Sequence, residues 1–482
     1  MEVLDRPEAG EWVSRNHRCL ANMDKFLNIF RVPDLRKRVL FTMGLLAVYR
    51  LGAQIPTPGV NGKLLDQFFH TQGGSALGLL DMFTGGSLRR FTIFALGIMP
   101  YITASIIFQL LTVVYEPLAR MQKEGEIGRR KITQWTRYLT VILAAFQSIA
   151  IAFGLNSQGM VTISGPAFIL LTVLTLTTGT AFIMWLGEQI TDRGIGNGMS
   201  LLIFTGIVAG LPRGVADLAD KVRTNAWGSF TVLAILLILV AMVGLVAFIV
   251  YVERSERRIP VQSARRIVGR RQMGGVSSHL PLKVNSGGVM PVIFASSLLS
   301  VPLLANSLSF VQSNKFFSNV IASLQPGEPW YEFLYMVLIV FFAYFYISIV
   351  FRPDDIADNM RKTGSFIPGI RPGRRTSDYI NGILTRITLV GAVYLILISL
   401  VPTFFLSGFH LNHLWLVGNV FEHLPTFITN GLHMNFYFGG TSLLIVVGVA
   451  MDTANQIESQ LIMRHYDGFS PRSGRIRGRK AW

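Results

Sequence analysis

The sequence predicts an all-α polytopic membrane protein with ten transmembrane helices, and three observations lead to this fold class. Of its 482 residues, 51% are hydrophobic and 15% are charged, whereas soluble domains average about 25% charged residues. Long stretches lack Asp, Glu, Lys and Arg, and the longest runs for 50 residues between Arg137 and Glu188. The basic residues, 44 against 27 acidic ones, are concentrated in alternate loops. Together these features indicate a chain whose apolar segments cross a membrane.

The same composition excludes other classes of protein. The high hydrophobic content excludes intrinsic disorder, and a disulfide scaffold is excluded because Cys19 is the single cysteine. A soluble nucleic-acid-binding protein would explain the net charge of +17 but not the long uncharged stretches.

The candidate spans follow from the apolar stretches in chain order. A helix needs about 20 apolar residues to cross the hydrocarbon core. The polar segment 156–166 divides the longest stretch into two spans, and the fifth span is short and rich in glycine. The ten predicted spans are 38–55, 91–114, 137–155, 167–187, 198–212, 228–252, 286–304, 333–351, 383–402 and 435–452.

The sidedness of the basic residues supports all ten spans. With ten crossings, 36 of the 44 Lys and Arg residues fall in loops and ends on one side and 7 on the other. The positive-inside rule places the rich side, with both chain ends, in the cytoplasm. Without the fifth span, loops 253–285 and 352–386 and the basic tail would move outside, so the alternation requires it.

The first residues differ from the rest of the chain. Residues 1–22 lack the continuous apolar region of a signal peptide. Met23 offers an alternative start just before an amphipathic segment. Two interpretations stay open: a disordered cytoplasmic extension, or a misassigned start.

Motifs for enzymatic chemistry are missing from the sequence. It contains no HExxH, Walker A, GxSxG or Cys-x-x-Cys motif. The segment 194–198, Gly-Ile-Gly-Asn-Gly, resembles a phosphate-binding loop, but no strand precedes it, so a tight loop against a neighbouring helix is favoured. A metal site in one external loop is disfavoured, because no carboxylate or Cys joins the four histidines there at ligand spacing, His410, His413, His423 and His433.

The acidic residues argue against two classes of membrane protein. Ion-coupled transporters keep an ionisable residue near the middle of the membrane. Here Glu188, Asp192, Glu253 and Asp452 all fall at the ends of spans. An intramembrane protease would need paired Asp, Ser-His or a zinc triad inside the spans, and none is visible. A transporter with a site made of backbone carbonyls stays open.

Six segments resemble the SecY family, the channel subunit of the protein-translocating Sec complex. They are ordered along the chain and cover it from about Met23 to Asp452; residues 1–22 and the basic tail lie outside the resemblance. The segments are FALGIMPYITAS at 94–105, KEGE at 123–126 with GRRK at 128–131, WLGEQITDRGIGNG at 185–198, HLPLKVN at 279–285, PGIRPG at 368–373 and FGGTSLLI at 438–445.

The resemblance implies an hourglass channel made of two halves of five helices each, related by a pseudo-twofold axis in the membrane plane. The N-terminal half is expected at 23–212 and the C-terminal half at 213–452, between the extension 1–22 and a basic cytoplasmic tail at 453–482. The family has a constriction of aliphatic side chains, which can seal by excluding water. Carried over by position, this ring is Ile98, Ile102, Met199, Ile203, Ile293 and Ile445; without the resemblance, all six would be assigned to helix packing.

The resemblance also implies two moving parts. One is a short plug helix within about 76–86 on the extracytoplasmic side, with Leu77, Leu79, Leu80, Met82 and Phe83; without the resemblance, it is equally a surface helix of an external loop. The other is a lateral gate, in which the second and third spans part from the seventh and eighth. The small residues of the seventh span suit such a seam.

Two basic loops are expected to serve for docking. The family uses them for the ribosome and for the SecA motor ATPase. A basic hairpin suits the phosphates of ribosomal RNA, and Arg371 is the residue most expected to matter for the motor, either by direct contact or by bonding backbone carbonyls. The docking residues are Arg254, Arg257, Arg258, Arg265, Arg266, Arg270, Arg271, Arg361, Lys362, Arg371, Arg374 and Arg375.

The function implied is a passive conduit in the bacterial cytoplasmic membrane, also called the inner membrane. Unfolded secretory polypeptides with signal sequences would cross it, and hydrophobic segments would leave sideways into membrane lipid. The expected partners are the small subunits SecE and SecG, with YidC and SecDF as further candidates. No catalytic residue, metal or cofactor is expected, so the energy must come from the motor or the ribosome.

Overall fold

The computed structural model describes most of the chain between residues 32 and 467. The predicted extension 1–22 and the end of the tail lie outside the described residues. The described ranges are 32–62, 64–65, 67, 81, 84–162, 165–224, 231–263, 266–268, 271–273, 277–305, 320, 323–324, 328–407 and 440–467.

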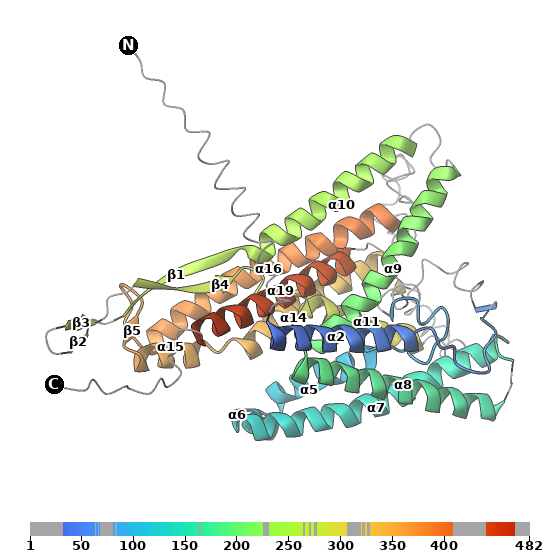
Figure 1. Cartoon of the computed structure of the whole chain (residues 1–482), viewed down its shortest axis with the longest axis horizontal. Helices are drawn as coiled ribbons and strands as arrows, with labels where there is room; N and C mark the ends of the chain where they lie inside the picture. Colours follow the sequence, from blue (N-terminus) through green and yellow to red (C-terminus); the bar gives the residue numbers. More distant parts are fainter. Residues whose placement is uncertain are drawn as a thin grey trace, which may run out of the picture.

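Each of the ten predicted spans overlaps one long helix (Figure 1). Apolar stretches interrupted by polar loops therefore gave the correct number and order of these helices. In chain order they are α2 (Pro33–Gly52), α5 (Met99–Val114), α7 (Glu126–Ser157), α8 (Pro166–Arg193), α9 (Gly198–Arg223), α10 (Thr231–Arg254), α11 (Met290–Ala305), α14 (Pro329–Val350), α16 (Arg374–Ser407) and α19 (Gly440–Asp467).

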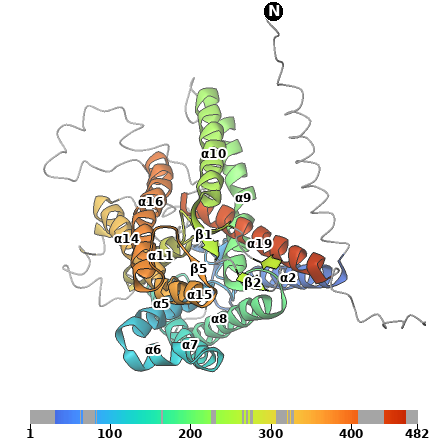
Figure 2. The ribbon, with the colours of Figure 1, turned by 90° about the vertical axis from the view of Figure 1, so that its left-hand side faces the viewer.

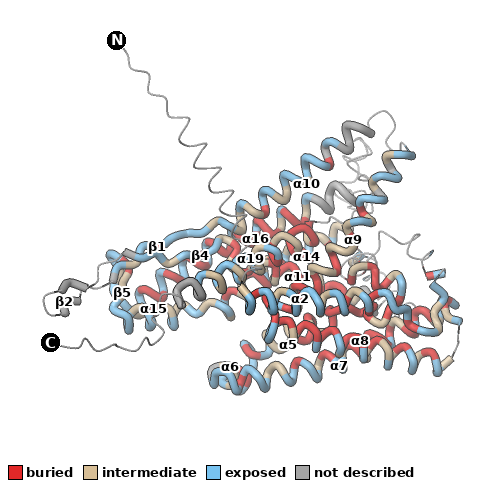
Figure 3. Tube along the Cα trace, viewed as in Figure 1, coloured by how far each residue is buried: buried red, intermediate tan, exposed pale blue. Residues whose placement is uncertain are grey.

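The helices form two groups that meet around one apolar core. In the first group α7 packs on α5 and α8, and α8 packs on α2 and α9; in the second, α14 packs on α11 and α16, and α19 packs on α10 and α16. Figure 2 shows α5, α7 and α8 on the opposite side of the bundle from α10 and α16. The groups contact each other through α5 with α11 and through α9 with α19. Buried residues concentrate where they meet (Figure 3).

The second span begins later than predicted. Residues 91–98 are buried turns, and the helix proper starts at Met99. Gly97 has φ 56°, a left-handed conformation that interrupts a helix, and Pro100 occupies the first helical turn, where its missing N–H costs nothing. The turns are fixed by backbone bonds to 55–57, such as Thr57 N–H to the Phe91 carbonyl at 2.8 Å. Tertiary pairing thus overrides the apolar run.

Two helices extend beyond their predicted spans. Helix α9 continues to Arg223 with Pro212 inside it, so the predicted boundary between halves at 212 falls within a helix. Helix α19 continues past Asp452 to Asp467. A helix can extend into water after its apolar part ends, and hydropathy marks only the part in lipid.

Length and composition alone qualify five of the described helices as membrane spans: α7, α8, α9 as far as Asp220, α16, and α14 taken with the following stretch to Lys362. A sixth span results if α5 is joined to α6 (Glu116–Lys123), although the chain bends by 105° between them. Helix α2 carries Asp34, Arg36, Lys37 and Arg38 in its first turns, and the apolar part of α11 is shorter than a full span.

A small sheet projects from one end of the bundle, here called the sheet end (Figure 1). It is formed by the loops that follow α10 and α14. Strand β1 (Glu256–Ser263) pairs antiparallel with β4 (Ser277–Lys283), and β5 (Ser365–Phe366) joins the other edge of β1. The ribbon β2 (Arg266–Val268) with β3 (Arg271–Met273) lies at the tip. Helix α15 (Pro353–Lys362) covers the region beside β5.

The sheet has its own apolar core. Ile259 on β1 and Leu282 on β4 are buried together with Ile380 and Leu384 from the first turns of α16. The sheet is therefore packed onto the bundle, which fixes the position of its exposed arginines.

Candidate functional site: the constriction between the two helix groups

The six predicted ring residues lie on four helices, of which α5 packs on α11 and α9 packs on α19. Ile98 and Ile102 belong to the start of α5, Met199 and Ile203 to the start of α9, Ile293 to α11 and Ile445 to α19. Five of them are buried in one apolar cluster, and Met199 packs against it half-buried. The same cluster contains packing residues from all ten long helices, so the six residues belong to the general core of the bundle.

Local backbone features set the positions of the α5 and α9 residues. Asn197 caps α9 by accepting the N–H of Met199 at 3.1 Å. The N–H of Gly198 donates to Thr191 Oγ1 at 2.9 Å, and the N–H of Ile195 donates to Thr42 Oγ1 at 3.1 Å. These N–H groups are occupied within the protein, which supports a tight loop at 194–198 and argues against phosphate binding there.

Helices α8 and α9 approach each other through two glycines. A Cβ at Gly198 would overlap the carbonyl of Gly187, and a Cβ at Gly187 would overlap the sulfur of Met199. Only glycine fits here, and the contact holds Met199 in place beside the core.

The contact between α5 and α11 is a seam of weak interactions. Ser297 Oγ lies 3.9 Å from Met99 Sδ, and both side chains are buried. The neighbouring Ser296 and Ser300 donate to carbonyls of their own helix, at 3.0 and 2.7 Å. Their hydroxyls are satisfied without crossing the seam, so parting α5 from α11 leaves few polar groups unpaired.

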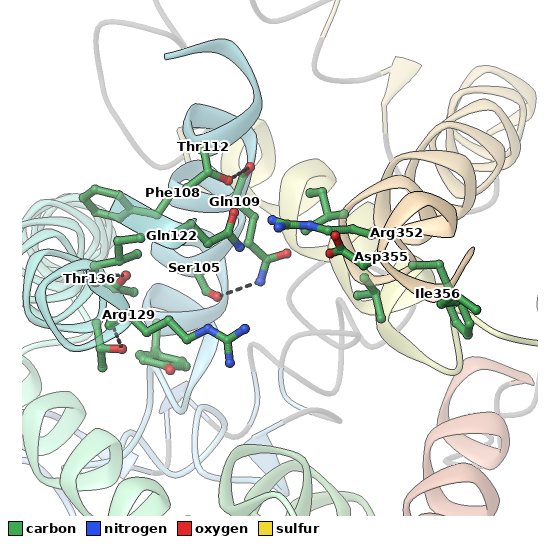
Figure 4. Close-up of a pocket in the computed structure, with 16 residues that line it drawn as sticks. Ser105, Phe108, Gln109, Thr112, Gln122, Arg129, Thr136, Arg352, Asp355 and Ile356 are labelled. Carbon is green, nitrogen blue, oxygen red and sulfur yellow. Dashed lines mark hydrogen bonds between the residues drawn. The ribbon is translucent and has the colours of Figure 1, made fainter. Parts of the chain in front are cut away.

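A cavity of about 760 Å³ opens at the sheet end of this seam (Figure 4). Its walls come from α5, α6 and α7 on one side and from the end of α14 and the start of α15 on the other. Arg129 and Arg352 reach into it from opposite sides, with Asp355 beside Arg352. Sequence reasoning counted Arg129 for topology and within the resemblance segment 128–131, and Arg352 with the basic loop 352–386, but it predicted no cavity, because a cavity between distant segments leaves no sequence pattern.

The predicted plug residues Leu77, Leu79, Leu80, Met82 and Phe83 lie outside the described residues. Their neighbour Asp81 is 4% exposed, and its Oδ1 accepts the N–H of Arg89 at 2.8 Å. Burial raises the pKa of Asp81, while the hydrogen bond from the Arg89 N–H and the charge of Arg213, within α9, oppose that shift. A Cβ at Gly85 would lie 2.6 Å from the carbonyl oxygen of Gly206, so the end of the predicted plug segment lies directly on α9.

The described docking residues lie at the sheet end. Arg257, Arg258, Arg361, Lys362, Arg371, Arg374 and Arg375 are exposed there, and Arg254 is exposed at the end of α10. Arg266 and Arg271 belong to the tip strands, and Arg265 and Arg270 lie outside the described residues. Pairing of β1 with β4 and β5 brings the two predicted docking loops together on one sheet.

Among the described residues, no group of three His, Cys, Asp or Glu side chains could hold a metal ion. The four histidines of the external loop lie outside the described residues. Glu188 forms an ion pair with Arg137 of α7, 2.6 Å between Oε1 and Nε, at the end of α8 nearer the sheet. That acidic residue therefore joins two helices.

Fold and site together define a multi-pass helical membrane protein whose two helix groups close on an apolar core. The sequence model described as SecY matches residues 92–454. The chain belongs to the SecY family.

Individual relatives agree. The protein translocase subunit SecY of Streptomyces griseus is 47% identical over 458 residues, covering 92% of this chain and 99% of its own. That of Escherichia coli K12 is 46% identical over 439 residues, covering 90% and 93%. The predicted family, and the prediction of a channel subunit that is not an enzyme, are confirmed.

Solved structures show the same fold at low sequence identity. A protein-conducting channel gives a TM-score of 0.61 at 16% identity and covers 90% of this chain and 94% of its own. Sec61 in a canine ribosome-channel complex gives 0.59 at 16% identity, with the same coverage. The predicted fold class of ten spans in two halves is thereby confirmed.

Proposed function

We propose that this protein is the central channel of a Sec translocon in a bacterial cytoplasmic membrane. It is a passive conduit for unfolded secretory polypeptides and a lateral exit for hydrophobic segments. The observation that supports this proposal is that the six predicted ring residues, contributed by four helices of both groups, belong to the apolar core of the bundle or pack against it, close to the α5–α11 seam.

The core can act as a seal. A narrow ring of aliphatic side chains holds water and ions poorly, so it blocks ions when no polypeptide is present. Unbranched Met199 is adaptable and can follow side chains of different size. The predicted plug would support the seal from the extracytoplasmic side, where Asp81 and Gly85 anchor the adjoining segment against α9.

Hydrophobic segments would leave through the seam between α5 and α11. The serine hydroxyls of α11 are already paired within the helix, which keeps the cost of parting low. The cavity at the sheet end lies between the third- and eighth-span helices, where a signal sequence would first meet the gate. Through the opened seam, the hydrophobic segment would come into contact with membrane lipid.

The sheet would dock partners from the cytoplasm. Its exposed arginines suit the phosphates of ribosomal RNA and the carboxylates of a motor such as SecA. A solved relative in this fold, the canine Sec61 channel, is described in complex with a ribosome. SecE and SecG would accompany the channel, with YidC and SecDF as further partners, and both chain ends would face the cytoplasm by the positive-inside rule.

Reconstitution tests the proposal. The full chain, purified with the two small subunits and inserted into vesicles, should protect a signal-bearing precursor from added protease only with SecA and ATP. The matched control is the same precursor without its signal sequence, which should stay accessible. Absence of protection while SecA still binds would overturn the conduit. Uptake of small solutes in its place would favour a secondary transporter.

A further inference from the structure

A short linker joins the sheet, which is the proposed docking surface and is called the docking sheet below, to α11, which borders the proposed lateral gate and is called the gate helix. Strand β4 ends at Lys283 and α11 begins at Met290. The intervening residues are Val-Asn-Ser-Gly-Gly-Val, and two glycines would make such a linker flexible on its own. A movement of the sheet would then be absorbed before it reached α11.

Asn285 holds this linker in place through two side-chain hydrogen bonds, which we call the clasp. Its side chain is 5% exposed, and Nδ2 donates to Glu253 Oε1 at 2.6 Å and to the Gly288 carbonyl at 3.1 Å. Glu253 belongs to the last turn of α10. The amide thus ties the linker both to α10 and to the turn that starts α11.

Backbone contacts reinforce the clasp. The N–H of Val284 donates to the Ser255 carbonyl at 3.0 Å, which joins the two chain segments at the base of the hairpin. A Cβ at Gly391 of α16 would lie 2.9 Å from the Val284 carbonyl oxygen, so α16 supports the linker from another side.

Charged groups surround Glu253 from neighbouring elements. Lys283 on β4 lies 3.8 Å from Asp452 on α19, measured from Nζ to Oδ1. The pKa of Glu253 is raised by burial and by Asp452, and it is lowered by the Asn285 bond and by Lys283. Tyr394 of α16 also faces this carboxyl. The clasp therefore lies where α10, α16, α19 and the sheet meet.

We infer that Glu253 and Asn285 are positioning residues that transmit movement of the docking sheet to the gate helix α11. The inference rests on the proposed function, in which a partner docks on the sheet. With the clasp closed, β4, the end of α10 and the start of α11 move as one unit. Without it, the linker bends at Gly287 and Gly288, and docking no longer opens the seam.

The experiment uses the full chain with its small subunits, SecA and ATP in vesicles. The variants are Glu253→Ala, Asn285→Ala and Glu253→Gln. Gate width is read as the distance between spin labels at positions 109 and 298, in a Cys19→Ser background. Residue 109 lies on α5 and the exposed residue 298 on α11. SecA affinity and precursor transport are measured in parallel.

Both alanine variants should keep SecA affinity within about twofold, lose the SecA-induced widening and transport about three- to tenfold more slowly, because each removes the hydrogen bond between Asn285 and Glu253. Glu253→Gln should retain widening and transport, since its amide oxygen still accepts from Asn285. Glu126→Ala is the matched control. Its exposed carboxylate pairs with Arg130 of the same helix, far from the linker in sequence, and it should behave as the unmodified chain.

A double variant that exchanges the donor and the acceptor of the Asn285–Glu253 bond distinguishes a positioning role from a general effect on folding. Asn285→Asp alone sets two carboxyl groups against each other and should lose coupling, whereas Asn285→Asp with Glu253→Gln restores a donor and an acceptor and should recover most of it. Normal widening and transport in both alanine variants would overturn the inference while leaving the proposed function intact. Failure of the unmodified chain to respond to SecA would overturn both.

Discussion

Ser297 on α11 and Met99 on α5 meet side chain to side chain across the two helix groups, with 3.9 Å between Oγ and Sδ. Both are buried, at 0% and 8% exposure. A hydroxyl against a thioether is a weak contact. Ser300 adds no bond across the seam, because its hydroxyl donates to a carbonyl of its own helix. The closed state of the seam therefore depends on close packing, which a change in volume can disturb.

Ser297→Leu should loosen the seam. The added side chain has no space beside Met99, and overpacking of this kind costs about 1–3 kcal/mol, which parting α5 from α11 would relieve. We expect greater ion conductance of the idle channel and faster transport of precursors with weakened signal sequences. Both are measurable in planar bilayers and vesicles.

Leu298→Phe is the control for that variant. Residue 298 is 43% exposed on the same helix, so a larger side chain there meets lipid and not α5. Equal conductance in the Ser297→Leu and Leu298→Phe channels would show that the seam does not depend on packing at Ser297.

The predicted ring gives a second prediction. Replacing Ile102 and Ile203 by Gly removes two aliphatic side chains from the central core and should let water and ions enter, raising idle conductance at least several-fold. Ile207→Gly is a matched control, because Ile207 is 2% exposed in the same cluster but one turn further along α9. Unchanged conductance in the double variant would rule out the ring assignment.

Sequence reasoning identified the helices well and their exact ends less well. Spans such as 167–187 are apolar stretches bounded by polar loops, and the lipid requirement alone specifies them. The segment 91–98 is equally apolar but pairs with 55–57, so its turns depend on a partner far away in sequence. Hydropathy contains no information about that partner.

For the candidate site too, some features could be predicted from the sequence and others depend on residues that are far apart in it. Ring positions came from a family resemblance, since periodicity alone assigns Ile98 or Ile445 to ordinary packing, and in the structure they share one large apolar cluster with packing residues of all ten long helices. The bond between Asn285 and Glu253 joins residues 32 positions apart. Neither polar residue is unusual in its own sequence context, so nothing in the sequence indicated the pair.

Gly198→Ala should destabilise the fold. Its Cβ would overlap the Gly187 carbonyl where α9 starts against α8, and two backbones cannot separate without loss of packing. We expect a loss of about 2–3 kcal/mol, seen as a lower melting temperature in detergent. Gly244→Ala in α10 is the control, because nothing lies within 4 Å of its added Cβ, and it should be neutral or slightly stabilising. Similar melting temperatures in both variants would contradict the close approach.

Glu253→Gln should change how stability depends on pH. Burial raises the pKa of Glu253 above its ordinary value of 4.5. A carboxyl with a raised pKa in the folded state stabilises the fold fully below its unfolded pKa and loses that contribution as pH rises through the folded pKa. The Gln variant lacks this loss, so at about pH 8 its melting temperature should equal or exceed that of the unmodified chain by about 1–3 °C.

The melting temperatures of the unmodified chain and of the Glu253→Gln variant should converge near about pH 4, where the buried glutamate is neutral. A Gln variant that is less stable at about pH 8 than at about pH 4, relative to the unmodified chain, would show that the ionised carboxylate stabilises the clasp.

Arg371→Glu should impair the motor-driven reaction without harming the fold. The side chain is exposed in the turn before α16, and only its backbone carbonyl is bound, by Thr376 Oγ1 at 3.0 Å among the contacts of the described residues. Surface substitutions of this kind usually change stability by less than about 0.5 kcal/mol. We expect SecA-driven transport in vesicles to fall at least tenfold. Arg386→Glu, an equal charge change at an exposed site of α16, should transport normally, and intact transport in the Arg371 variant would show that this residue has no role in coupling to the motor.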